Sequence, residues 1–150
     1  MHFEVEAFIH RPPEDVFDFF SDLHQQPRRK GSVVPVYDKI TPGPVGVGTR
    51  FREVIRLLPF LKGEVISEIT GYDPPHSLDY SFVAFGKMDG ELTYRLEPVG
   101  EGVRVSQRQT LRPRGTLLRL LGPLIGTAFS RAIDHRLKGI KKLLEGGTSP

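Results

Sequence analysis

A carboxylate among apolar residues is the clearest hint of chemistry in this sequence. Strand-like alternation places Phe51, Glu53 and Ile55 on one face. It places Arg50 and Arg52 on the opposite, solvent-facing side. A carboxyl group inside the fold is a candidate general acid or base, so Glu53 is the best candidate for a catalytic residue. The alternative is that Glu53 pairs with an arginine or lies at the mouth of a cavity.

Two amides form a second candidate group. Gln107 and Gln109 continue the strand face begun by Val103 and Val105. Amides on an inward face must be hydrogen-bonded or hydrated, and they are suited to orienting a polar group of a ligand in an apolar pocket. The alternative is that this end of the strand meets solvent.

Aromatic residues make up the third group. The alternation of the strands and the spacing of the last helix direct Tyr80, Phe82, Tyr94 and Phe129 toward the interior. Such residues are usually core, and lining a cavity is compatible with that role. Either tyrosine hydroxyl is a potential donor to a ligand carbonyl. The predicted ligand-binding residues are therefore Phe51, Glu53, Tyr80, Phe82, Tyr94, Gln107, Gln109 and Phe129.

The sequence contains no motif for metal binding, nucleophilic catalysis or nucleotide binding. There is no cysteine, and the five histidines are dispersed, with no HExxH pattern and no pair at i,i+4. No nucleophile elbow, phosphate loop or dinucleotide fingerprint is present. We therefore expect no metal and no cofactor. The net charge of +3 is mild, and the basic clusters are not interleaved with aromatics, which argues against nucleic-acid binding.

The elements that must position these residues follow from periodicity. A strand over Phe3–Ile9 is followed by a helix from Pro13 to about Leu23. The strands expected next are Val33–Ile40, Thr49–Leu58, Lys62–Gly71, Leu78–Ala84, Glu91–Glu97 and Val103–Leu111, with turns at 86–90 and 98–102. A helix over Thr116–Glu145 ends the chain, as one helix or as two if Gly122 and Pro123 interrupt it. Its apolar stripe is Leu118, Leu121, Ile125, Phe129, Ile133, Leu137, Ile140 and Leu144.

This order predicts an α+β helix-grip fold, in which a curved antiparallel sheet wraps around a long C-terminal helix. Consecutive hairpins imply antiparallel pairing, and the last helix is the only element long enough to cover the apolar face. The length suits one domain over residues 1–150, with 146–150 as a loose tail.

The chain resembles the START-like, Bet v 1-like superfamily (SRPBCC), and in particular its polyketide cyclase/dehydrase and lipid-transport group. The stretches that carry the resemblance are 12–19, 46–52, 73–75 and 135–145, in the expected order over nearly the whole chain. The resemblance implies a cavity between sheet and helix, and it implies ligand binding more firmly than catalysis.

Three functions follow as expectations. The first is binding of a small hydrophobic molecule such as a lipid, polyketide or aromatic metabolite. The second is a cofactor-free cyclase or dehydratase acting through Glu53 or a tyrosine. The third is a protein- or membrane-interaction module that uses the apolar segment Leu117–Phe129 and its flanking arginines, although a place in the core suits that segment better.

Location and partners are expected as follows. The N-terminus lacks the pattern of a secretory signal, and Leu117–Phe129 is too short and broken to span a bilayer. We expect a cytoplasmic protein without stable membrane insertion. A homodimer is a possible assembly.

Overall fold

Tight turns join the later strands into one antiparallel sheet. The N-terminal strand forms one edge of this sheet and pairs with the C-terminal strand. The computed structural model describes residues 1–21, 36–58 and 61–146. Its elements are β1 (His2–Ile9), α1 (Pro13–Ser21), β2 (Val36–Lys39), β3 (Arg50–Leu58), β4 (Leu61–Asp73), β5 (Ser77–Ala84), β6 (Met88–Val99), β7 (Gly102–Pro113), α2 (Thr116–Leu120) and α3 (Gly122–Gly146). The sheet has seven strands in the order β1-β7-β6-β5-β4-β3-β2, and every neighbouring pair is antiparallel.

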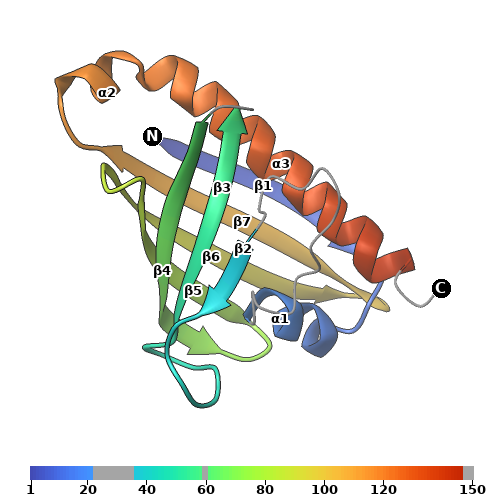
Figure 1. The fold of residues 1–150 in the computed structure, drawn as a ribbon. Coiled ribbons are helices and arrows are strands. Elements are labelled where there is room, and N and C mark those ends of the chain that lie inside the picture. Colours follow the sequence, from blue (N-terminus) through green and yellow to red (C-terminus); the bar gives the residue numbers. More distant parts are fainter. Residues whose placement is uncertain (22–35, 59–60, 147–150) are drawn as a thin grey trace.

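The sheet curves around α3, which lies across its concave face (Figure 1). Burial alternates along β5 as the period-two pattern predicts, with Leu78, Tyr80 and Phe82 inside. The helix buries Phe129 and Ile133, followed by Leu137 and Ile140, against this face. The predicted helix-grip fold is therefore confirmed.

Helix α1 closes one end of the curved sheet. Its Phe17 and Phe20 are fully buried, and their rings pack on Tyr72 and Tyr94 with centroids 5.4 Å and 4.4 Å apart. The hydroxyl of Tyr80 donates to the carbonyl oxygen of Phe20 at 2.7 Å and so satisfies an acceptor near the end of this helix. These contacts fix α1 to the strands that carry the predicted site.

Two turns are shorter in the structure than predicted. The first hairpin turn occupies 85–87 rather than 86–90, because Phe85 and Gly86 both adopt positive φ (56° and 65°) and reverse the chain within a shorter loop. The second turn is likewise limited to 100–101, with Gly100 at φ 59°. Leu23 and Val33, at the expected ends of the first helix and the second strand, lie outside the described residues, as does the expected tail beyond Gly146.

The C-terminal helical segment is two helices, separated at Leu121. Pro123 has no N–H to donate to the preceding turn, so a new helix begins at Gly122. The break changes which leucines are covered. Leu121 was expected in the apolar stripe but is 41% exposed, whereas Leu118 and Ile125 are partly buried. Within the described parts of the chain, no helix is both long and apolar enough to cross a bilayer.

Gly90 is a crowded position on the inner face of the sheet. A Cβ there would lie 2.2 Å from Phe82 Cζ and 2.5 Å from the carbonyl oxygen of Thr110. Gly90→Ala is expected to lower the free energy of unfolding by about 1–3 kcal/mol, because the backbone must shift to make room. Urea unfolding measures the effect.

Gly46→Ala is the matched control, since a Cβ at Gly46 meets no atom within 4 Å. Its stability should stay within about 0.5 kcal/mol of the parent. Equal stability of the Gly90 and Gly46 variants would contradict the packing described for the inner face.

Candidate ligand-binding site

A cavity of about 150 Å³ lies between the concave face of the sheet and α3. Residues from β3 to β7 form its floor and residues of α3 form its roof. Its wall is mostly apolar and draws on both apolar clusters of the core, for example Tyr80 and Tyr94 from one and Phe82 and Ile133 from the other. The two clusters thus meet around an open space.

The cavity exists because two residues of α3 above it are small. The helix lines the cavity with Ala128, Phe129, Ala132, Ile133 and Arg136, the three- and four-residue steps that place side chains on one face. Ala128 and Ala132 fill little volume where the neighbouring turns carry phenylalanine and isoleucine. Because Ala128 is exposed as well as lining the cavity, the cavity opens to solvent beside it.

Glu53 projects into the cavity from β3 and is only 7% exposed. Its Oε2 lies 3.8 Å from Nη1 of Arg136, so the carboxylate and the guanidinium form an ion pair in the cavity wall. The structure therefore combines both expectations for this residue, namely a place among apolar neighbours and an arginine partner. Arg136 is itself mostly covered, which keeps solvent from screening the pair strongly.

Two buried polar atoms in the cavity wall make no hydrogen bond. Among the described residues, neither Glu53 Oε2 nor Ser67 Oγ has a hydrogen-bond partner. Ser67 lies on β4 beside Phe51 and Phe82, on the same inner face as Glu53. A buried polar atom without a partner costs about 1–3 kcal/mol, so the fold maintains these two at a penalty.

Tyr94 stands close to the same charges. Burial raises the pKa of its phenol to about 12, the positive charge of Arg136 acts to lower it, and the negative charge of Glu53 raises it. The phenol therefore keeps its proton at neutral pH and is available only as a neutral donor or acceptor. Glu53, Tyr94 and Arg136 thus form a polar group within a mainly apolar cavity.

The two glutamines lie where the strand alternation places them. Gln107 is 6% exposed and sits between Val5 and Tyr94 on the neighbouring strands, whereas Gln109 is half-buried and sits opposite Leu92. Both line the cavity. Gln107 is therefore covered and Gln109 is partly exposed, while the next residue on the same face, Leu111, is fully buried.

Seven of the predicted residues line the cavity: Glu53, Tyr80, Phe82, Tyr94, Gln107, Gln109 and Phe129. Phe51 does not. It is fully buried on the same strand face, with its ring 6.4 Å from that of Tyr80, and it belongs to the core behind the cavity. Whether these side chains bind a ligand remains a prediction.

Sequence reasoning missed Arg136 and Ser67. Both carry a periodicity signal, since Arg136 follows Ile133 by three residues on the cavity face of α3, and Ser67 lies between Val65 and Ile69 in period two. Each is a polar residue at a position where the apolar periodicity expects an apolar one. Such a position can mark a polar side chain that faces the interior. No cluster of three or more potential metal ligands occurs in the part of the chain that the structure describes.

Comparisons with known proteins agree with this fold. The model of the family described as polyketide cyclase/dehydrase and lipid transport matches residues 1–145, so the chain belongs to this family. No curated protein matches the chain.

Solved structures show the same fold at low sequence identity. TTHA0849 from Thermus thermophilus is 23% identical with a TM-score of 0.82, over 99% of this chain and 100% of that one. Norcoclaurine synthase from Thalictrum flavum is 16% identical with a TM-score of 0.63, over 91% and 86%. Major latex-like protein 151 from Panax ginseng is 14% identical with a TM-score of 0.63, over 91% and 96%. Their likeness concerns the Bet v 1-like fold alone.

Proposed function

We propose that the protein binds a small, mainly apolar molecule with one hydroxyl or amino group in the cavity between the sheet and α3. The observation that carries the proposal is a pair of buried polar atoms without a hydrogen-bond partner, Glu53 Oε2 and Ser67 Oγ, in a mainly apolar wall. A ligand hydroxyl can donate to the carboxylate and accept from the serine, which removes the cost of both orphan atoms.

The size of the cavity narrows the class of ligand. An apolar cavity of about 150 Å³ is large enough for a benzene-sized molecule. Drug-sized ligands need about 300 Å³ or more, so a larger ligand would extend through the opening beside Ala128. A hydroxylated ring or a short hydroxylated chain fits both the volume and the polar group. The family's description, which joins polyketide enzymes with lipid transport, is compatible with such molecules.

Thermal unfolding with p-cresol, a methyl-substituted phenol, tests the proposal. A ligand that binds only the folded state raises the Tm by mass action. At about tenfold above its Kd, p-cresol is expected to raise the Tm by about 3–6 °C for a chain of this length. Ala132→Phe, which puts a ring into the cavity, should abolish the shift.

His135→Phe is the matched control, because it adds the same ring to an exposed position of α3 that does not line the cavity. It should keep the parent's shift. A full p-cresol shift in Ala132→Phe would place binding elsewhere and contradict the proposal.

A second candidate is a cofactor-free reaction in the same cavity. It is favoured by the position of the Glu53 carboxylate, which lines the cavity beside the Arg136 guanidinium. In this reading Glu53 accepts a proton from the carbon next to a ketone, and Arg136 stabilises the negative charge that develops on the ketone oxygen. Such an enolate is the nucleophile needed for ring closure, and loss of water from the product would follow.

Proton exchange tests this candidate without the natural substrate. In deuterated water, the protein should speed the exchange of the methyl hydrogens of acetophenone by about a hundredfold over buffer, as monitored by proton NMR. Glu53→Gln should remove that gain. Glu68→Gln, on the exposed face of the neighbouring strand, is the control. Equal exchange rates in the parent and Glu53→Gln would rule out Glu53 as the base and leave the binding proposal standing.

A further inference from the structure

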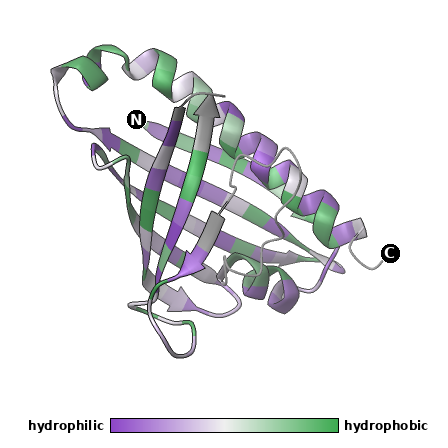
Figure 2. Ribbon diagram, in the orientation of Figure 1, coloured by the Kyte–Doolittle hydropathy of each residue, from purple (hydrophilic) through white to green (hydrophobic). Residues whose placement is uncertain are grey.

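Four leucines stand on the surface where the chain leaves the sheet. Leu117, Leu120, Leu121 and Leu124 are 70%, 74%, 41% and 72% exposed, and no residue of α2 is buried. We call these four residues the leucine face. Helix α2 lies beyond the edge of the sheet, and Figure 2 shows it as strongly hydrophobic (Figures 1 and 2). Neighbouring exposed leucines of this kind usually mark a contact surface.

The leucine face runs to the opening of the cavity. Leu117, Leu120 and Leu121 are spaced by three and four residues, which places them on one side of α2. On α3, Leu124 and Ala128 are four residues apart and lie on one side of the helix, and Ala128 is the exposed residue at the rim of the cavity. The apolar surface therefore continues from α2 along α3 to that opening.

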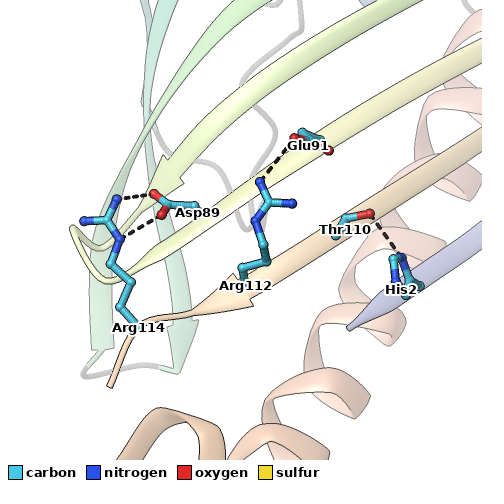
Figure 3. A network of polar contacts seen from close by, with 6 residues as sticks. All are labelled: His2, Asp89, Glu91, Thr110, Arg112 and Arg114. Atoms are coloured by element: carbon cyan, nitrogen blue, oxygen red, sulfur yellow. Dashed lines mark hydrogen bonds and ion pairs between the residues drawn. The ribbon is translucent and has the colours of Figure 1, made fainter. Parts of the chain in front are cut away.

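Two arginines beside the leucine face, Arg119 and Arg131, form no ion pair within the described residues, whereas the other four arginines of this part of the chain do. Residues 102–133 contain six arginines and no aspartate or glutamate. Arg112 and Arg114 are paired with Glu91 and Asp89 on β6, as Figure 3 shows. In contrast, no acidic side chain of the described ranges pairs with Arg119 or Arg131.

Arg119 on α2 and Arg131 in the first half of α3 lie beside the same groove. They line an open groove of about 750 Å³ at the start of β1 and α3, together with the hydroxyl residues Thr127 and Ser130. A surface with exposed leucines and unpaired arginines combines apolar burial with attraction for negative charge.

The base of α2 is held firmly. Arg114 donates from Nε to Asp89 Oδ2 at 2.8 Å and from its terminal nitrogen to the second carboxylate oxygen (Figure 3). The backbone N–H of Arg114 also donates to the carbonyl of Lys87 at 2.8 Å. Gly115 then turns the chain at φ 93°, which a glycine adopts without strain. The sheet thus presents α2 in a defined direction.

We propose that the leucine face, with Arg119 and Arg131, docks reversibly on the surface of an anionic lipid bilayer. The leucines enter the interfacial region while the arginines meet lipid phosphates and carboxylates. A second copy of the chain is a poorer occupant, because a two-fold contact would bring the unpaired arginines of both copies together. The proposal does not depend on what the cavity binds.

Vesicle flotation with the full chain tests the proposal. The protein should float with vesicles of equimolar phosphatidylcholine and phosphatidylserine, and much less with phosphatidylcholine alone. Added salt should weaken binding by screening the arginines. Replacing both Leu120 and Leu124 by aspartate should reduce partitioning by about tenfold or more, because these side chains no longer gain from leaving water. Replacing Arg119 and Arg131 together by glutamine should reduce it by about tenfold.

Val47→Asp is the matched control, since Val47 is 70% exposed in the loop between β2 and β3, at the far end of the molecule from α2 (Figure 1). It should float like the parent. Because every replaced side chain is exposed, the Tm of each variant should match the parent's.

Three results would overturn the proposal. The parent would fail to float with anionic vesicles, or the leucine variant would float like the parent. Alternatively, sedimentation would show a dimer that the leucine replacements dissociate, without vesicle binding, and the leucine face would then be an interface between copies.

Discussion

The burial of α3 against the concave face of the sheet is the interaction on which the rest of the structure depends. Phe129, Ile133, Leu137 and Ile140 anchor the helix, and the small side chains of Ala128 and Ala132 leave the space beneath it unfilled. A curved sheet covered by one straight helix leaves room where the helix side chains are small. The cavity and the core follow from how α3 packs on the sheet. The exposed leucines follow from the break at Leu121 between α2 and α3.

The buried polar groups of the cavity lower the stability of the fold, which indicates that they serve a function other than stability. An apolar residue at position 53 or 67 would avoid the free-energy cost of burying a polar atom without a hydrogen-bond partner. Arg136 offsets part of the charge of Glu53, and burial keeps Tyr94 protonated, with its pKa at about 12. A site of this composition holds a hydroxyl or amino group at one place while the rest of the ligand meets apolar side chains.

Strand periodicity predicted most of the fold and of the cavity wall, because alternation assigns each side chain to a face. It placed Glu53, Tyr80 and Gln107 correctly. Alternation gives no position along the strand, so Phe51 was grouped with the cavity although it packs behind it. Arg136 was missed because its place depends on how α3 is rotated over the sheet, which is set by tertiary packing. The exposure of Leu121 likewise follows from the break between α2 and α3. The spacing of apolar residues does not predict how the helix axis changes direction at such a break.

The central claim is that the cavity recognises one polar group on an apolar ligand through Glu53. Calorimetric titration of the parent and Glu53→Gln with p-cresol and with toluene tests it most directly, because the two ligands differ only in the hydroxyl. The parent should prefer p-cresol over toluene by about tenfold or more, and Glu53→Gln should lose most of that preference while still binding toluene. An equal preference in both proteins would contradict the account.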